Sequence, residues 1–168
     1  MGGALRHRGP DGSGSWYQRE RGVGLGHRRL SIIDLSAAGH QPANDHFVIS
    51  FNGEVFNFEA LRRELDETGH APSWRGHSDT EVMLAAFEAW GIERAVRRFV
   101  GMFAFAVWDA REGELTLARD RLGVKPMYWA RTPAGLCFGS ELKSLQHFPE
   151  FCTDIDRTVL AAFLQNYC

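Results

Sequence analysis

Cysteine is scarce in this sequence, and its spacing fits neither a disulfide framework nor a zinc site. The 168 residues include three cysteines, Cys137, Cys152 and Cys168, and no two of them form a C-x-x-C pair. An odd, widely spaced set favours a reducing compartment over a disulfide-stabilised secreted fold. The seven histidines show no H-E-x-x-H or other ligand spacing, so we expect no bound metal.

Long apolar runs and an excess of one charge are also lacking. No segment approaches the roughly 18 apolar residues of a spanning helix, and the N-terminal residues contain no signal-peptide core. The 19 Lys and Arg residues against 21 Asp and Glu residues give a net charge of −2, so the chain has no overall positive field that would attract nucleic acid. We therefore expect a cytoplasmic protein that binds neither nucleic acid nor a membrane.

The composition that remains is typical of one globular domain. Hydrophobic residues make up 44% of the chain and charged residues 24%, and the length is sufficient for a core without disulfides or a metal. Residues 102–108 are apolar on both alternating faces, so a strand there must be covered on both sides. The closely spaced strands indicate antiparallel pairing, and the clustering of helices apart from strands favours an α+β fold.

Periodicity and turn signals place the individual elements. Residues 7–15 are rich in turn formers and are expected to form a loop. Strands are expected at 23–33, 47–51, 102–108, 114–119, 127–130 and 136–138, and helices at 57–68, 78–90, 93–99, 141–147 and 156–166. The helix from residue 78 has Ser78 or Asp79 as its cap, and Asn52-Gly53 between apolar segments is a hairpin signal.

Several familiar catalytic motifs are excluded by spacing. The chain contains no G-x-x-x-x-G-K-[ST] phosphate loop and no G-x-G-x-x-G that opens a helix. Residues 76–80 resemble the nucleophile elbow of serine hydrolases, but Thr80 stands where that motif needs glycine. Taken singly, Arg29 is an ordinary solvated charge on a strand, Asp79 a helix cap and Asp120 a turn brace.

A set of motifs in a fixed order points to a family. The chain resembles the glutamine amidotransferase domain of glutamine-hydrolysing asparagine synthetases in RHRGPD at 6–11, RLSIID at 29–34, FNGEVFN at 51–57, SDTE at 78–81, GMFAFA at 101–106, RDRLGVKP at 119–126 and SELK at 140–143. The resemblance covers nearly the whole chain. It implies a four-layer αββα sandwich of two antiparallel sheets between helices, as in N-terminal-nucleophile hydrolases, with the first strand missing.

The resemblance also assigns the parts of a glutamine site. Arg29 would hold the α-carboxylate, because a guanidinium can grip it with two parallel hydrogen bonds, and Asp79 would hold the α-ammonium. The Asn52 side-chain amide and the Gly53 backbone N–H would form the oxyanion hole. The complete set of expected substrate-binding residues is Arg29, Leu30, Ser31, Ile32, Ile33, Asn52, Gly53, Glu54 and Asp79.

The family nucleophile, an N-terminal cysteine, has no counterpart in this chain, where Gly2 follows Met1. We therefore expect a domain shortened at both ends that lacks glutaminase activity. Residues 1–150 would form the amidotransferase domain, and residues 151–168 a helical lead into an absent synthetase domain. No cofactor is expected here, because ATP and Mg belong to that absent domain. The resemblance also allows a homodimer of the full-length enzyme.

Two other interpretations remain open from the sequence. A non-catalytic glutamine-sensing or interaction module would keep the pocket without the nucleophile, and the upstream gene sequence would distinguish it. A structural remnant without a ligand would expose unpaired strand edges and would show no thermal stabilisation by glutamine. The final nitrogen acceptor cannot be inferred from these residues.

Overall fold

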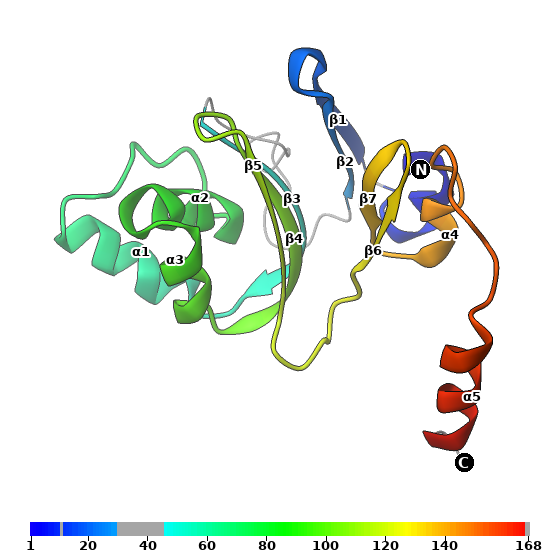
Figure 1. Cartoon of the computed structure of the whole chain (residues 1–168). Helices are drawn as coiled ribbons and strands as arrows, with labels where there is room; N and C mark the ends of the chain where they lie inside the picture. The colour runs from blue at the N-terminus through cyan, green and yellow to red at the C-terminus, as the bar shows by residue number, and fades with distance from the viewer. Residues whose placement is uncertain (11, 30–45, 167–168) are drawn as a thin grey trace.

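The computed structural model describes residues 1–10, 12–29 and 46–166 (Figure 1). Its central element is an antiparallel sheet in the order β3 (Phe47–Val55), β4 (Gly101–Asp109) and β5 (Glu114–Arg119). In the register of β3 and β4, Phe47 lies opposite Asp109 and Val55 opposite Gly101. All residues from Phe103 to Asp109 are buried, which confirms that this strand is covered on both faces.

Three helices cover one face of this sheet. These are α1 (Phe58–Glu67), α2 (Asp79–Trp90) and α3 (Ile92–Arg98) (Figure 1). Alternate residues of β3 and β4 pack against them in a core that includes Phe87 and Phe105, whose ring centroids lie 5.7 Å apart. The three helices confirm the sequence prediction to within one or two residues at most ends.

A second layer of strands covers the opposite face. It consists of two antiparallel pairs, β1 (Gly12–Gln18) with β2 (Val23–Arg29) and β6 (Tyr128–Thr132) with β7 (Gly135–Gly139) (Figure 1). A smaller core joins the layers through Leu25 of β2 and Val48, Ala106 and Trp108 of the central sheet. A short 3-10 helix, η2 (Arg19–Arg21), connects β1 to β2.

The outer layer on this side is formed by short helices from the two ends of the chain. The 3-10 helix η1 (Gly2–Arg8) contacts α4 (Leu142–Leu145), and α4 contacts both β6 and β7. The Glu141 carboxylate fastens the two helices together, 2.8 Å from His7 Nε2 and 3.1 Å from Arg8 Nη1. The layers therefore follow the order helix, sheet, strands, helix, as the predicted αββα sandwich requires.

The last helix, α5 (Arg157–Asn166), lies apart from these layers (Figure 1). Its apolar side chains are exposed, with Val159 at 64% and Phe163 at 53%. The assignment of residues 151–168 as a lead into another domain stays a prediction. No helix among residues 1–10, 12–29 and 46–166 is long and apolar enough to cross a bilayer.

Two local predictions are wrong. Residues 12–15 were expected in a loop but belong to β1. Their glycines and serines have low strand propensity, but pairing with β2 stabilises the extended conformation. Asn52-Gly53 is not a hairpin turn, since β3 continues through it to Val55. The strand expected at 23–33 is observed as Val23–Arg29, and the remainder lies outside the described residues.

Gly53 is required for close packing of β3 on β4 and not for a hairpin turn. Its φ is +149°, and a Cβ at this position would lie 2.1 Å from the Met102 carbonyl oxygen of β4. Only glycine permits so close an approach of the two strands. The Asn-Gly pair therefore marks a tight backbone contact inside a sheet.

Candidate functional site

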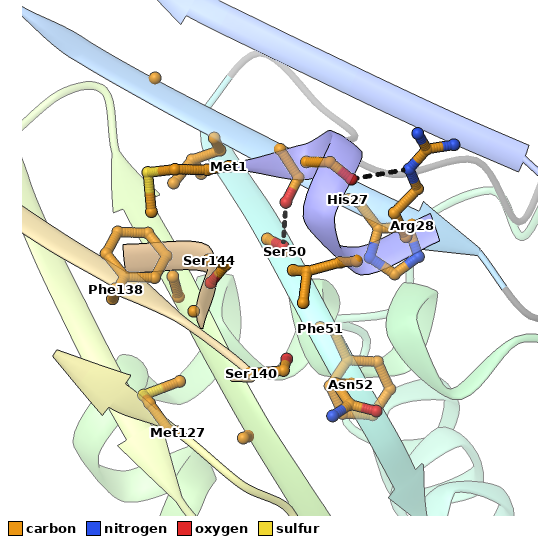
Figure 2. Close-up of a pocket in the computed structure, with 18 of the residues that line it drawn as sticks. Met1, His27, Arg28, Ser50, Phe51, Asn52, Met127, Phe138, Ser140 and Ser144 are labelled. Carbon is orange, nitrogen blue, oxygen red and sulfur yellow. Dashed lines mark hydrogen bonds between the residues drawn. The ribbon is translucent and has the colours of Figure 1, made fainter. Parts of the chain in front are cut away.

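A cavity of about 930 Å³ lies between the central sheet and the second strand layer. Its wall includes residues of β2, β3, β4 and β7 and the first turn of α2. Figure 2 shows that His27, Asn52, Met127 and Ser140 reach this space from different parts of the chain. A free amino acid fills only part of such a volume, so the cavity has room for a small polar ligand.

Asp79 begins helix α2 and is 5% exposed. Its neighbour Ser78 is the N-cap, accepting a bond from the Glu81 N–H at 3.3 Å, so the capping role falls to Ser78 and leaves Asp79 available. The Asp79 carboxylate accepts bonds from the N–H groups of Val55 at 3.0 Å and Thr80 at 2.8 Å. These bonds fix the carboxylate against the end of β3.

The environment of Asp79 disfavours its negative charge. Burial raises the pKa of Asp79 above the usual carboxyl range, the two N–H donors partly offset this, and the Glu54 charge raises it further. Among the described residues, no Lys, Arg or His forms an ion pair with Asp79. A buried carboxylate without a cation is suited to bind a cationic ligand group.

The Asn52 amide nitrogen is the one side-chain polar atom, among those of the described residues, that is buried without a hydrogen-bond partner. Leaving a buried donor unpaired costs about 1–3 kcal/mol. Such an atom in a folded protein calls for an explanation, and a ligand oxygen that completes its bond is one. Asn52 lines the same cavity as Asp79, as the assigned oxyanion role requires.

The Gly53 N–H faces the same side as the Val55 N–H that reaches Asp79. Both polar backbone groups of Phe103, which lies opposite Gly53, are used by Asp120: the Asp120 N–H donates to the Phe103 carbonyl at 2.7 Å, and the Phe103 N–H donates to Asp120 Oδ2 at 3.2 Å. Gly53 and Phe103 thus form a non-hydrogen-bonded pair. The Gly53 N–H consequently points away from β4, toward the edge of β3 that pairs with no other described strand.

Part of the expected substrate set lies outside the described residues. Leu30, Ser31, Ile32 and Ile33 belong to the segment 30–45 that is not described, and of Arg29 only the backbone is placed, at the end of β2 opposite Gly12. The structure brings Asn52, Gly53, Glu54 and Asp79 together around one cavity. The proposed carboxylate contact of Arg29 stays a prediction.

Other cavity-lining residues were not identified from the sequence. Lys125 and Met127 line the wall from the loop after β5, and His27 and Arg28 line it from β2. Their positions follow from the packing of separate layers, so no local pattern could have assigned them. Within residues 1–10, 12–29 and 46–166, no group of three or more His, Cys, Asp or Glu side chains could hold a metal ion.

Comparison with known proteins identifies the family. Residues 1–168 match the family model described as "Glutamine amidotransferase domain". The chain belongs to this family. The amidotransferase domain is 41% identical over 162 residues to asparagine synthetase [glutamine-hydrolyzing] 3 of Bacillus subtilis (strain 168), covering 94% of the chain and 25% of the relative.

Two further matches agree with this assignment. A putative asparagine synthetase [glutamine-hydrolyzing] of Mycobacterium tuberculosis (strain ATCC 25618 / H37Rv) is 43% identical over 169 residues, covering 93% of the chain and 26% of the relative. The chain thus spans about a quarter of the length of these curated relatives. The solved glutamine phosphoribosylpyrophosphate amidotransferase of B. subtilis has a TM-score of 0.62 at 22% identity, over 73% of this chain and 28% of that chain, which supports the predicted sandwich fold.

Proposed function

We propose that this domain binds free L-glutamine in the cavity beside β3 and that, within a larger enzyme, it hydrolyses the side-chain amide. The ammonia would serve the ATP-dependent amidation of aspartate or a related carboxylate. The observation that carries the proposal is the buried, unpaired Asn52 amide nitrogen in the same cavity wall as the buried Asp79 carboxylate. A ligand that carries both an oxygen able to accept a hydrogen bond from Asn52 and a cationic group near Asp79 would satisfy both residues.

The chemistry of glutamine matches these groups. Its ammonium would bind the Asp79 carboxylate, and its α-carboxylate would bind Arg29 at the end of β2. During hydrolysis the amide carbonyl oxygen gains negative charge. The Asn52 Nδ2 and the Gly53 N–H would donate to that oxygen, and a preorganised donor of this type lowers the barrier by about 3–4 kcal/mol.

The nucleophile is the second part of the proposal. In the family resembled, a cysteine thiolate attacks the amide carbon, and its free α-amine serves as the base. None of Cys137, Cys152 and Cys168 carries both a thiol and a free α-amine, and Cys137 is buried, which raises the pKa of its thiol. We therefore expect the 168-residue chain to bind glutamine without hydrolysing it.

Titration calorimetry on the 168-residue chain tests this function directly. L-glutamine should release heat with a saturable isotherm, whereas L-2-aminopentanoate, which lacks the amide, should bind at least about tenfold more weakly because the Asn52 donor stays unpaired. An ammonia-release assay with the same sample should show no turnover. A folded chain that gives no heat with glutamine would contradict the binding proposal, and steady ammonia release would contradict the inactivity.

The exposed face of α5 bears on the larger enzyme. Val159, Leu160, Phe163 and Leu164 leave apolar surface on a helix that lies apart from the layers of the described residues. Since the curated relatives are about four times as long as this chain, we propose that α5 leads into and packs on a synthetase domain. ATP and Mg would bind there, and no residue of the described cavity is assigned to them.

A further inference from the structure

Asp120 occupies an unusual position at the end of the β4–β5 ladder. The regular pairing stops at Ala104 opposite Arg119, so Asp120 is the next residue, beside Phe103. Its N–H donates to the Phe103 carbonyl, as that of a strand residue would. In the second bond of the pair, however, the Phe103 N–H donates to the Asp120 carboxylate and not to the Asp120 carbonyl. The side chain therefore replaces a backbone carbonyl in the last step of the ladder.

The same carboxylate also shapes the loop that follows. It accepts bonds from the N–H groups of Val124 at 2.8 Å and Lys125 at 2.9 Å, and Asp120 is only 7% exposed. These N–H donors hold the pKa of Asp120 below its usual range, and the bond from Lys125 has the largest effect. One ionised carboxylate thus joins strand β4 to the loop 122–126.

Arg119 holds the loop from its carbonyl side. Its Nε donates to the Lys125 carbonyl at 2.7 Å, and its Nη2 donates to the Gly123 carbonyl at 2.5 Å. Gly123 has a φ of +65°, and a Cβ there would lie 2.9 Å from the guanidinium. Both backbone groups of Lys125 are therefore fixed, one by Asp120 and one by Arg119.

These contacts reach the candidate site from two sides. Phe103 lies opposite Gly53, whose backbone rests directly on Met102 and Phe103, so a shift of Phe103 moves the proposed oxyanion donor. Lys125, Pro126 and Met127 line the cavity. The carboxylate of Asp120 links this wall to β4, the strand against which Gly53 packs.

We propose that Asp120 is a positioning residue of the glutamine site, because it fixes the spacing between the Gly53 donor and the cavity wall at Lys125. Asp120 itself does not line the cavity and needs no contact with the ligand. The inference deepens the proposed function and rests on it for its binding readout. It assigns a role in ligand recognition to a residue whose sequence context indicates only a turn brace.

Asp109 provides a matched control at the opposite end of β4. It is 9% exposed and does not line the cavity. Its Oδ1 accepts bonds from the N–H groups of Arg111 and Glu112 at 2.9 Å each and lies 3.1 Å from His46 Nε2. The turns are similar, since the Gly113 N–H donates to the Asp109 carbonyl four residues earlier and the Gly123 N–H to the Asp120 carbonyl three residues earlier. Asp120→Asn and Asp109→Asn each replace one acceptor oxygen by a donor at a strand end.

The experiment compares both variants with the unmodified chain by thermal melting and by glutamine calorimetry. Both variants should melt at lower temperature, but only Asp120→Asn should raise the glutamine dissociation constant. The expected rise is about tenfold, which corresponds to about 1.4 kcal/mol, the loss expected when a displaced donor no longer makes its hydrogen bond. Unchanged affinity in Asp120→Asn, or equal losses in the two variants, would overturn the proposal. Should Asp120→Asn fail to fold, Arg119→Gln, an exposed change, must raise the dissociation constant about threefold, and no change would overturn it.

Amide hydrogen exchange separates this inference from the proposed function. In Asp120→Asn, exchange should accelerate relative to Asp109→Asn at Lys125 and at Asn52 and Glu54, the neighbours of Gly53 whose N–H groups point toward β4. If the unmodified chain binds no glutamine, the proposed function fails, and the exchange result alone decides whether Asp120 fixes the two sides of the cavity. Exchange at Asn52, Glu54 and Lys125 that matches the control would refute the positioning role.

Discussion

Replacing Asp79 by asparagine is the sharpest test of the candidate site. The carboxylate is buried, without a cation partner among the described residues, and aligned by the N–H groups of Val55 and Thr80. A hydrogen bond to a charged group contributes about 1.5–3 kcal/mol, and 1.4 kcal/mol is a factor of ten in affinity. Asp79→Asn should therefore weaken glutamine binding by roughly 10- to 150-fold.

The pH dependence of glutamine binding provides a second, independent test of the role of Asp79. Burial, with help from the Glu54 charge, raises the pKa of Asp79, so the carboxyl group holds its proton to a higher pH in the fold than in the unfolded chain. Its contribution to stability is then complete below the ordinary carboxyl pKa and is lost as pH rises through the raised value. Binding of an ammonium needs the ionised form. Glutamine affinity should therefore increase with pH through this window, and Asp79→Asn should abolish the increase.

A control variant is available on the same helix. Glu81 also accepts two backbone N–H bonds, from Arg75 at 2.6 Å and Gly76 at 3.1 Å, but it does not line the cavity. Calorimetry from pH 4 to 8 should give Glu81→Gln the affinity and pH profile of the unmodified chain. If Asp79→Asn binds glutamine within threefold of the unmodified chain, or if Glu81→Gln loses as much, Asp79 is not the ammonium partner.

Three further changes test other parts of the molecule. In Asn52→Ala, removal of the unpaired buried donor offsets the lost side-chain packing, so the melting temperature of the free chain should stay nearly unchanged while stabilisation by glutamine weakens; a large loss of stability without ligand would contradict this. Gly53→Ala should destabilise the fold by more than about 3 kcal/mol in denaturant titration, because its Cβ would overlap the Met102 carbonyl. Hydrogen bonds with His7, Lys143 and Arg8 lower the pKa of Glu141 to about 2, so its stabilising contacts are present above pH 4.5 and are lost as pH falls toward 2. Proteolysis of the η1 segment should accelerate over that interval, and in Glu141→Gln it should be fast at all pH values.

Much of the fold could be predicted because its signals are local. The strand at 101–109 is apolar on both faces, and helix α2 has a serine cap and a terminal glycine, so each element is specified by its own residues. Strand β1 was missed because the glycines and serines of residues 12–15 have low strand propensity, and only pairing with β2 makes the strand stable. Tertiary pairing overrides local preference there.

The Asn52-Gly53 pair shows why the site is harder to predict than the fold. Asn-Gly supports a two-residue hairpin because both residues tolerate positive φ, and that is the stronger local signal. In this chain the glycine instead permits a close contact with β4, and the asparagine keeps an amide nitrogen unpaired. Local statistics cannot distinguish these uses, because the difference depends on Met102 and Phe103, some fifty residues later in the chain. The resemblance to a family supplied the role that the pattern alone did not.

Each group assigned to the ligand lowers the stability of the empty domain. Asn52 leaves a donor unpaired, Asp79 buries a charge, and Gly53 sacrifices side-chain packing for backbone proximity. The aromatic core on the helical side, with Phe87, Phe99 and Phe105 fully buried, offsets such costs. A ligand that pairs the donor and neutralises the carboxylate removes both penalties at once. Glutamine should therefore stabilise this domain by more than its few direct contacts would suggest, and the excess should disappear in the Asn52→Ala and Asp79→Asn double variant.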